Sequence, residues 1–456
     1  MRSLKIGVSG VRGVVGESLT PQLLVRFAQA FGTYIGPGKI VVGRDTRTSG
    51  EMVREALVGG LRACGCNVVD IGVAPVPTAQ LAVRDLRADG GVAITASHNP
   101  AEWNAFKFIR GDGVFLNSHQ TEELFEVYRQ GEYALADVHR LGRLHYDDAA
   151  IERHIAKVLA LVDVAEIRRA RFKVVIDCCN GAGSEATPEL LNSLGCRVVR
   201  LNTKPDGRFP HPPEPIPANL GQLCEAVRAN DADIGFAQDA DADRLAIVSD
   251  KGRAIGEEYT LALAALFYVE RTTEPGPLVA NLSTSRMVDD IADRFGRPVI
   301  RTPIGEVNVA EAMLRARAVI GGEGNGGVMV PRVHYGRDSL AGICLVLEGL
   351  ARHRMSVSRI ISKRAGLLPK YHICKDKVTV PARDIVRVMT AFARAHETER
   401  LNLEDGVKID WEDSWLHVRP SNTEPISRVI AEASTMARAR EIVTQSNQII
   451  ARELAR

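Results

Sequence analysis

The sequence contains no long apolar run. Its longest apolar stretches, Leu261–Val269 and Leu340–Leu347, are well short of the ~20 residues that a membrane-spanning helix needs. The N-terminal segment Met1–Gly7 also lacks the apolar centre of a secretory signal peptide. From these absences we expect a cytoplasmic protein with no membrane partner.

An excess of one sign of charge is missing as well. The chain has 58 Lys and Arg against 56 Asp and Glu, which gives a formal net charge of +2. This balance gives no reason to expect nucleic acid or an anionic membrane as a partner. Any recognition of an anion must therefore be local.

Cysteines are few and are poorly spaced for disulfides or metal sites. There are eight of them, with no CxxC pair, and Cys64/Cys66 and Cys178/Cys179 are too close for ordinary bridges. In a chain of this length, scattered cysteines indicate reduced core residues. We therefore expect neither a disulfide framework nor a zinc site.

What the sequence does have is length and a regular alternation of elements. At 456 residues it exceeds a single core and predicts roughly three or more domains. Strand-like and helix-like segments alternate from Leu4 to about Arg354, which predicts α/β domains, and the remainder predicts a smaller α+β domain. Predicted helices include 20–35, 49–63 and 77–87, and the predicted domains are residues 1–150, 151–252, 253–366 and 367–456.

Three of the predicted strands end in polar loops. The strand Ala93–Thr95 leads into residues 97–99, Gly235–Ala237 leads into 239–244, and Ala318–Ile320 leads into 322–327. In open α/β sheets, ligands gather at the carboxyl ends of strands. Three related domains could therefore present these loops to one cleft.

The first loop, residues 95–100, reads TASHNP. The apolar run before it delivers Ser97 and His98 into a polar segment, and Pro100 stops the strand from continuing. A serine in such a place can act as a nucleophile or carry a covalent phosphate. By itself the pair also fits a turn with a capping hydroxyl. Lys107 lies in a second strand-like run that leaves this loop.

The second loop, residues 239–244, reads DADADR. If the segment is extended, alternate side chains share a face, and the carboxylates of Asp239, Asp241 and Asp243 converge. Three close carboxylates repel one another unless a cation lies among them, and a hard ion such as Mg²⁺ meets that need. Ca²⁺ is a competitor, because DxDxD also opens EF-hand loops, but Arg244 and Asp250 stand where that motif needs Gly and Glu. A solvated acidic turn is the remaining alternative.

A third motif lies in the last predicted domain. Residues 419–428, RPSNTEPISR, form a tight loop between two strands, with two guanidinium groups and several hydroxyls. Arginine binds phosphate with two donors, and hydroxyls with backbone N–H groups complete a tetrahedral cradle. A hairpin loop with surface charges is the alternative.

Two glycine-rich segments and one arginine give weaker signals. In GGEGNGG, residues 321–327, the glycines allow close approach to a ligand, and Glu323 and Asn325 could bond sugar hydroxyls. A flexible turn explains this segment equally well. In GVRG, residues 10–13, Arg12 could reach an anion. NGAGS, residues 180–184, lacks the spacing of a dinucleotide fingerprint and predicts a close helix–strand packing turn.

Together these motifs resemble, in order and spacing, those of the α-D-phosphohexomutase family along essentially the whole chain. The resemblance implies three related α/β domains with mixed sheets and a smaller C-terminal α+β domain around a central cleft. It assigns a phosphoserine loop, a metal loop, a sugar-recognition loop and a phosphate-binding loop to the four predicted domains in turn. It also implies an isomerase that binds Mg²⁺ and a small-molecule sugar phosphate, as a monomer or homo-oligomer.

The resemblance further implies roles for single residues. Ser97 would carry the transferable phosphoryl group and would bind Mg²⁺ together with Asp239, Asp241 and Asp243. Lys107 aligns with an acid and Arg12 with a base, although an arginine rarely loses its proton. His98 and Arg244 would support the phosphate electrostatically. The residues expected to bind substrate are Glu306, Glu323, Asn325, Arg419, Ser421, Asn422, Thr423 and Arg428.

The implied reaction passes through a bound hexose 1,6-bisphosphate, which also serves as activator. Phospho-Ser97 donates its phosphoryl group to the free hydroxyl of a hexose monophosphate. The bisphosphate then reorients and returns its other phosphate to Ser97, while Mg²⁺ neutralises charge on the transferring group. The loop in the fourth domain would bind the phosphate that is not reacting.

Three departures from the family pattern bear on the site. Ala240 replaces a glycine of the metal loop and would strain it if that position needs positive φ. Asn325 stands where a serine is common, and Glu306 where phosphomannomutase/phosphoglucomutase enzymes tend to have histidine. An acidic group there could favour the ammonium of glucosamine, so the leading expectation is a phosphoglucosamine mutase.

Three alternatives stay open at this point. The rival within the class is a phosphomannomutase/phosphoglucomutase of broad specificity. A non-catalytic sugar-phosphate sensor is the rival of another class, although it would not need Ser97, Lys107 and the three aspartates together. A phosphatase would result if the phosphoryl group of Ser97 were lost to water.

Overall fold

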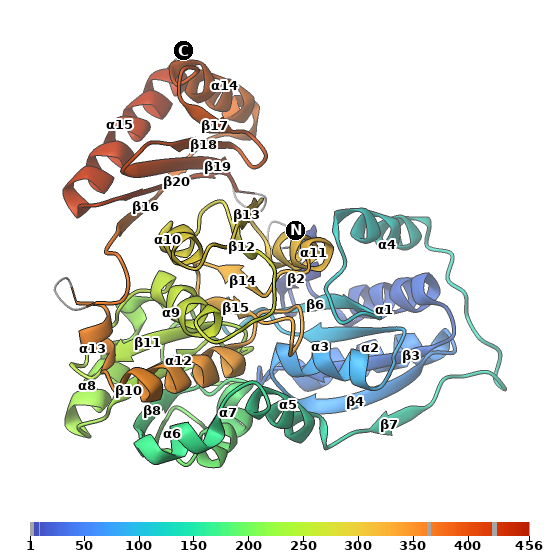
Figure 1. Ribbon diagram of the computed structural model, residues 1–456. Helices are drawn as coiled ribbons and strands as arrows, with labels where there is room; N and C mark the ends of the chain where they lie inside the picture. Colours follow the sequence, from blue (N-terminus) through green and yellow to red (C-terminus); the bar gives the residue numbers. More distant parts are fainter. Residues whose placement is uncertain (1–3, 9, 363–365, 422–425, 456) are drawn as a thin grey trace. The chain divides into compact units, whose positions relative to one another are not determined.

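The structure is a computed structural model that describes residues 4–8, 10–362, 366–421 and 426–455 (Figure 1). The described residues form two compact units. The first comprises the chain up to Glu274 together with Val319–Ser358. The second comprises Pro275–Ala318 together with the chain from Arg359 onward.

A seven-stranded mixed sheet opens the first unit, with the strand order β1-β2-β6-β5-β3-β4-β7 (Figure 1). The β5-β3-β4-β7 part is parallel, whereas β1, β2, β6 and β5 pair antiparallel. The strands are β1 Lys5–Gly7, β2 Gly10–Val14, β3 Lys39–Arg44, β4 Asn67–Val73, β5 Gly90–Ile94, β6 Trp103–Arg110 and β7 Leu144–Tyr146. The helices are α1 Pro21–Ile35, α2 Gly50–Ala63, α3 Val76–Asp85 and α4 Ser118–Gln130.

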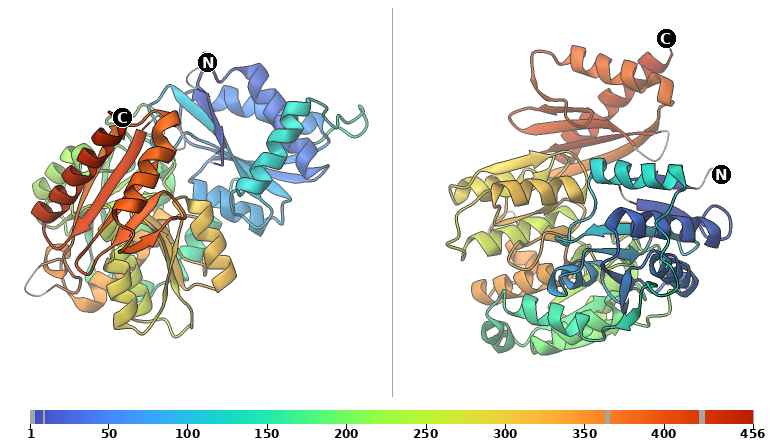
Figure 2. Two further views of the ribbon diagram at one scale, coloured as in Figure 1. Left: turned by 90° about the horizontal axis from the view of Figure 1, so that it is seen from above. Right: turned by 90° about the vertical axis from the view of Figure 1, so that its right-hand side faces the viewer.

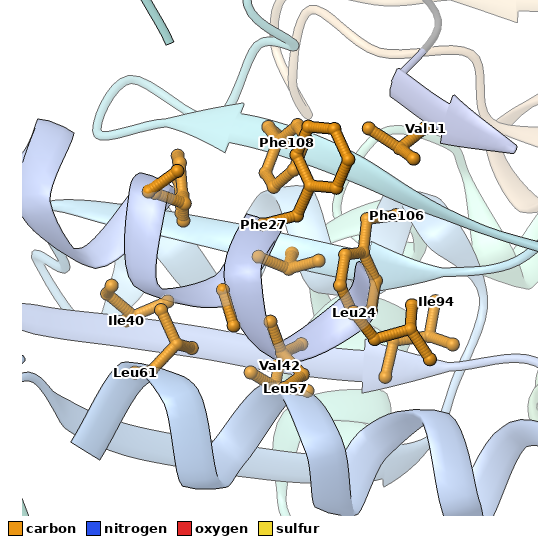
Figure 3. Close-up of a cluster of buried hydrophobic side chains, with 14 of the residues drawn as sticks. Val11, Leu24, Phe27, Ile40, Val42, Leu57, Leu61, Ile94, Phe106 and Phe108 are labelled. Atoms are coloured by element: carbon orange, nitrogen blue, oxygen red, sulfur yellow. The ribbon is translucent and has the colours of Figure 1, made fainter. Parts of the chain in front are cut away.

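Apolar side chains from the helices and strands of this part of the chain form the first core. Thr20 caps α1 through its side chain, which accepts a hydrogen bond from the backbone of the first turn. Leu24 and Phe27 of α1 then pack with Phe106 and Phe108 of β6 (Figure 3). Burial of this cluster stabilises the sheet from which the serine loop extends.

A second mixed sheet in the first unit has the order β11-β10-β8-β9, with β11 antiparallel and the others parallel. Two further strands, β14 and β15, pair antiparallel and contact α9. The strands are β8 Lys173–Asp177, β9 Arg197–Leu201, β10 Ile234–Gln238, β11 Leu245–Ser249, β14 Ile320–Glu323 and β15 Gly327–Met329. The helices are α5 Ala150–Leu159, α6 Val164–Ala170, α7 Gly183–Ser193, the 3₁₀ helix η1 Pro217–Asn219, α8 Gly221–Ala229, α9 Glu258–Val269 and α12 Ser339–His353.

The second unit contains a parallel strand pair and a five-stranded antiparallel sheet. The pair is β12 Leu278–Asn281 with β13 Val299–Thr302, contacted by α10 Met287–Arg294 and α11 Glu306–Ala316. The sheet has the order β16-β20-β19-β18-β17, and α14 and α15 lie on one of its faces (Figure 2). The other bounds are α13 Val357–Ile360, β16 His372–Thr379, η2 Ala382–Asp384, α14 Ile385–Ala395, β17 Arg400–Asn402, β18 Val407–Asp410, β19 Ser414–Pro420, β20 Ile426–Ala433 and α15 Met436–Leu454.

The predicted fold class, α/β domains with mixed sheets and a smaller C-terminal α+β domain, is confirmed. The four predicted domain boundaries stay predictions. The sequence patterns described above miss α4 and α11. In α4 only Thr121, Leu124 and Phe125 are buried, so its apolar stripe is too short to stand out.

Two general features concern membranes and thiols. Within the part of the chain that the structure describes, no helix is both long enough and apolar enough to cross a bilayer. All eight cysteines are free, and six of them are buried.

A histidine ties the loop of residues 203–216 to the end of β8. His211 Nε2 lies 3.1 Å from Asp177 Oδ2, and His211 Nδ1 lies 2.9 Å from the carbonyl oxygen of Pro212. Burial alone would lower the pKa of His211, but hydrogen bonds to Asp177 and Cys179 raise it to about 11. The imidazolium is therefore the form that the folded chain stabilises.

We expect His211 to stabilise the fold in a pH-dependent manner. Its pKa rises from about 6.5 in an unfolded chain to about 11 here. The stabilisation is thus fully present below about pH 6.5 and is lost as the pH rises towards about 11. His211→Gln should lower the thermal midpoint most near pH 6 and progressively less towards pH 10, as measured by differential scanning calorimetry.

His145, an exposed histidine of β7, supplies the control. His145→Gln should leave the midpoint unchanged across the same pH range. A difference between wild type and His211→Gln that stays constant with pH would contradict the raised pKa.

Candidate active site

The serine loop and a neighbouring loop leave the same edge of the first sheet. β3 and β5 are parallel, with Arg44 opposite Ile94, so the two strands end side by side. Asp45 directly follows β3, and Ser97 lies three residues after β5. The strand pairing therefore brings the loop after β3 against the loop that carries the predicted nucleophile.

Arg47 holds the serine loop with its whole guanidinium group. Its Nε donates to Asp45 Oδ2 at 3.0 Å, and both side chains are completely buried. All five N–H donors are used. The other four go to the carbonyl oxygens of Ser97 (2.6 Å), Asn99 (2.7 Å), Pro100 (2.5 Å) and Trp103 (3.0 Å).

Asp45 extends the same network to the backbone N–H of Ser97. Asp45 Oδ2 accepts from Thr95 Oγ1 at 2.7 Å, and Thr95 Oγ1 accepts from Ser97 N at 2.9 Å. Burial raises the pKa of Asp45, although Arg47 opposes this effect. Ser97 has a φ of 50°, a left-handed conformation that costs a non-glycine residue about 1–2 kcal/mol. Bonds to both its N–H and its C=O hold Ser97 in that conformation.

The aspartate loop is a turn. β10 and β11 pair antiparallel with Gln238 opposite Leu245, so residues 239–244 must reverse the chain direction. The segment is therefore not extended, and the carboxylates converge through the turn rather than through the alternation of side chains along a strand. The left-handed residue of the turn is Ala242, with a φ of 55°, so Ala240 in place of glycine brings no strain from positive φ.

The turn gathers three carboxylates next to Ser97 and Lys107. Ligand oxygens of Asp239, Asp241 and Asp243 lie within 4.8 Å of one another, and all three residues are buried. Ser97 Oγ donates to Asp239 Oδ2 at 3.1 Å. Lys107 Nζ, from β6, donates to Asp241 Oδ2 at 2.7 Å and lies 4.0 Å from Asp243 Oδ2. The first two motifs of the sequence thus form one cluster.

The charges and the unpartnered oxygens of this cluster fit a divalent cation. Burial and the neighbouring charges of Asp241 and Asp243 raise the pKa of Asp239 well above its usual value. Burial would also raise the pKa of Asp241, but Lys107 holds it below its usual value. Asp241 Oδ1 and Asp243 Oδ1 are buried and have no hydrogen-bond partner among the described residues. A set of oxygen ligands alone is the kind that Mg²⁺ prefers.

Two further predicted residues, Arg12 and His98, belong to the surroundings of the serine loop, and a third, Arg244, has its Nε 3.9 Å from Asp239 Oδ2 and from Asp243 Oδ1. Arg12 Nη1 donates to Asn99 Oδ1 at 2.6 Å. His98 Nδ1 lies 3.4 Å from Ser97 Oγ. Burial, together with the charges of Arg244 and Arg12, lowers the pKa of His98 to about 2. The imidazole is therefore neutral, and the positive charge near the serine belongs to the arginines and Lys107.

Arg337 connects the predicted sugar loop with the metal loop. Its Nη1 donates to Glu323 Oε2 at 2.9 Å, and its Nη2 donates to Asp243 Oδ2 at 2.6 Å. Asn325 Nδ2 lies 3.4 Å from the same Glu323 oxygen. Glu323 and Arg337 are buried, and Asn325 is partly exposed. The structure therefore joins Glu323 and Asn325 to the aspartate cluster through one guanidinium group.

The other predicted substrate residues lie in the second unit. Glu306 is the first residue of α11 and is 9% exposed. Arg419 of β19 is directly opposite Arg428 of β20, and Ser421 follows β19. The remaining two, Asn422 and Thr423, lie outside the described residues.

A second cluster with metal-ligating side chains is better explained as a hydrogen-bond network. His154 Nε2 and His334 Nε2 lie 2.9 Å and 3.3 Å from Asp338 Oδ2. His334 Nδ1 accepts from Gly336 N at 2.9 Å, so its proton is on Nε2. Because both Nε2 atoms donate to the carboxylate, neither offers a lone pair to a metal there.

Sequence reasoning missed Asp45, Arg47 and Arg337, which position the site. A signal for the first two was available, because DTR follows the apolar strand β3 in the same strand-then-polar-loop pattern as the three loops described above. Arg337 has no such signal, since it precedes a helix and meets its partners only through the fold.

Comparison with known proteins assigns the family. Four family models match residues 3–134, 152–252, 256–366 and 376–448, and they describe α/β/α domains I, II and III and the C-terminal domain of phosphoglucomutase/phosphomannomutase. A Thermococcus kodakarensis protein named "Phosphoglucomutase/phosphomannomutase" is 40% identical over 95% of this chain and 96% of its own. The chain belongs to the phosphoglucomutase/phosphomannomutase family of phosphohexomutases.

Other relatives agree with this membership. A Methanopyrus kandleri protein named "Probable phosphoglucosamine mutase" is 36% identical over 98% of this chain and 97% of its own. A crystal structure of a phosphoglucomutase/phosphomannomutase family protein from Burkholderia thailandensis has a TM-score of 0.84 at 26% identity and covers 98% of both chains. The resemblance and the predicted enzyme class, a phosphohexomutase that is an isomerase, are confirmed.

We expect Arg47 to be needed for both stability and the geometry of Ser97. Arg47→Ala should lower the free energy of unfolding by about 3–5 kcal/mol, because it leaves Asp45 buried without its partner. Arg47→Lys keeps the charge but cannot serve four carbonyl oxygens. It should slow phosphorylation of Ser97 by hexose 1,6-bisphosphate about 100-fold, as followed by intact-protein mass spectrometry.

The control for this pair is Arg129→Lys, which changes an exposed arginine in surface ion pairs and should have neither effect. Phosphorylation of Arg47→Lys at the wild-type rate would show that the serine loop does not depend on the several N–H donors of the Arg47 guanidinium group.

A second expectation concerns Gly181, which touches the metal loop. A Cβ at this position would lie 2.6 Å from the carbonyl oxygen of Ala240 and 2.8 Å from its Cα. Gly181→Ala should displace the aspartate turn and weaken Mg²⁺ binding by about tenfold or more, as measured by calorimetric titration. Gly221→Ala, where nothing lies within 4 Å of the new carbon, should bind Mg²⁺ like wild type. Equal affinities of the two variants would show that the turn tolerates the contact.

Proposed function

We propose that this phosphohexomutase is a phosphoglucosamine mutase that works through a phosphoserine at position 97. The observation that carries the proposal is the 3.1 Å hydrogen bond from Ser97 Oγ to Asp239, within a buried cluster that also holds Lys107. The cluster combines a phosphoryl acceptor, a cation site and a proton donor, which are the parts that phosphoryl transfer requires.

The first transfer starts from phospho-Ser97. The free hydroxyl of a hexose monophosphate attacks the phosphorus, and the bond between phosphorus and Ser97 Oγ breaks. Lys107 supplies a proton to Ser97 Oγ, and we assign the proton of the attacking hydroxyl to Arg12 in its neutral guanidine form, the form whose nitrogen has a lone pair to accept it. Burial lowers the pKa of Arg12, and Arg244 and Arg47 add to this effect although Asp241 opposes it, which supports that role.

The second transfer reverses the first on the other end of the sugar. The bound hexose 1,6-bisphosphate reorients, and its other phosphoryl group returns to Ser97. Arg244 and the neutral His98 stabilise the phosphoryl oxygens by charge and by hydrogen bonding. Asp239, Asp241 and Asp243, with the phosphoserine, would hold Mg²⁺, which when bound neutralises negative charge on the transferring group.

The reaction also requires a site for the phosphate that is not reacting, and the second unit supplies suitable groups. Arg419 and Arg428 stand directly opposite each other in an antiparallel pair. Like charges in this position destabilise a sheet. A bound phosphate dianion would relieve that repulsion, so we assign this phosphate to the two arginines with Ser421, Asn422 and Thr423.

Glu306 supports glucosamine phosphate as the substrate. It is an acidic, largely buried residue at the start of α11, and it would attract the ammonium at C2 of the sugar. We assign hexose recognition to Glu306 together with Glu323 and Asn325. The second candidate is a phosphomannomutase/phosphoglucomutase of broad specificity, which the 40% identity to a protein of that name favours.

The test is a comparison of initial rates with Mg²⁺ and a trace of hexose 1,6-bisphosphate. We expect kcat/KM to be highest for glucosamine phosphate among the glucosamine, glucose and mannose phosphates. Ser97→Ala should abolish turnover of all three, because no phosphoenzyme can form. Ser118→Ala, at an exposed serine of α4, is the matched control and should retain full activity.

The outcomes separate the candidates. Equal or faster turnover of glucose and mannose phosphates would favour the enzyme of broad specificity. Release of inorganic phosphate without isomer formation would indicate a phosphatase. No turnover of any of these sugars would contradict the proposed function.

A further inference from the structure

The second unit contains a serine–histidine pair that the proposed function does not use. Ser283 Oγ lies 2.7 Å from His417 Nδ1, and His417 Nε2 lies 2.7 Å from the carbonyl oxygen of Asp405. Ser283 follows β12, His417 belongs to β19, and Asp405 precedes β18. The fold thus brings together three residues from separate parts of one unit.

The hydrogen-bonding roles in this chain of three groups are fixed. A carbonyl oxygen only accepts, so His417 Nε2 carries a proton and donates to Asp405. Burial lowers the pKa of His417 to about 4 although Asp405 opposes this effect, and the charges of Arg419 and Lys408 also lower it, so the ring is neutral. His417 Nδ1 therefore accepts, and the hydroxyl of Ser283 donates its only proton to it.

Asp405 also holds the neighbouring loop. Its Oδ2 accepts a hydrogen bond from Ile304 N at 2.9 Å. Ile304 lies between β13 and Glu306, and β13 is the parallel neighbour of β12. The loops of Ser283 and Glu306 therefore leave the same edge of this strand pair, where ligands of α/β sheets bind.

The sheet face that bears His417 also bears the arginines of the phosphate-binding loop. Side chains two residues apart along a strand share a face, so His417 and Arg419 lie on one side, with Arg428 opposite Arg419. The intervening Val418 points to the apolar core under α14 and α15. His417 is fully buried, whereas Ser283 is partly exposed. Ser283 is the member of its pair that a ligand can reach.

We propose that Ser283 is a specificity-determining contact to the hexose, and that His417 and Asp405 are its positioning residues. Because its proton is committed to His417, Ser283 can accept a hydrogen bond but cannot donate one. That role fits a hydroxyl or an ammonium group of the sugar and does not fit a phosphate oxygen, which needs a donor. The inference rests on the proposed function, since it takes the same sugar phosphate as the ligand.

The test uses titration calorimetry to measure the binding of hexose 6-phosphates. The affinity for each parent hexose 6-phosphate is compared with the affinities for its 2-, 3- and 4-deoxy analogues. Wild type should prefer the parent over one analogue by about three- to tenfold, the value of one hydrogen bond. Ser283→Ala should lose that preference and keep the preferences at the other positions. Ser283→Thr, which retains a hydroxyl, should restore it.

Thr284→Ala is the matched control, because the neighbouring Thr284 is buried and its hydroxyl donates to Asn281 Oδ1 within the loop. It should leave every preference unchanged. If Thr284→Ala acts like Ser283→Ala, or if Ser283→Ala retains the wild-type pattern, the assigned contact is wrong.

A double-variant cycle tests the role of His417. His417→Leu should reduce the same single preference, because the serine hydroxyl is no longer held, and should add nothing when combined with Ser283→Ala. Additive effects would show that His417 does not act through Ser283.

These results are separable from those that concern the proposed function. A wild type that binds the sugars with this pattern but does not isomerise them would contradict the mutase proposal and support the Ser283 contact. If wild type isomerises the sugars and Ser283→Ala keeps the wild-type binding preferences, the mutase proposal is supported and the Ser283 contact is contradicted. A wild type that binds no hexose phosphate would overturn both.

Discussion

Repulsion among three buried carboxylates is the constraint on which the rest of the site depends. Asp239, Asp241 and Asp243 are buried in one turn, and their ligand oxygens lie within reach of one ion. Charges that close are unfavourable in a low dielectric unless cations lie against them. Lys107 comes from β6 and Arg337 from the segment before α12, so two other parts of the chain must fold against the turn to stabilise it.

The serine is fixed by a second network, which acts through the backbone. Ser97 is held in a left-handed conformation by bonds to its N–H and C=O, and these come from Thr95 and Arg47. Asp45 joins the two. Such a network stabilises only when every member is satisfied, since a buried charge without a partner is costly. The conformation of the predicted nucleophile therefore depends on Thr95, Asp45 and Arg47, whose bonds to it run through its backbone.

In each of the two units, a hydrogen-bonded polar pair fixes a loop that carries a predicted or proposed functional residue. In the first, the buried pair of Asp45 and Arg47 fixes the loop that carries Ser97. In the second, Asp405 and His417 fix the loops that carry Ser283 and Glu306. In both units, loops at the carboxyl ends of parallel strands are held by a polar pair of which at least one side chain is fully buried.

The sequence by itself determined the fold class and the family, and it predicted the residues that carry chemistry. Apolar runs that end in polar loops mark Ser97 and the aspartates, because strand burial and loop polarity are local properties of the chain. The sequence did not determine how the aspartates meet, since the reversal between β10 and β11 depends on antiparallel pairing. Nor did it pair Ser283 with His417 or Arg337 with Glu323. Those contacts were decided by the tertiary structure alone, because a hydrogen bond between distant segments leaves no local pattern in either of them.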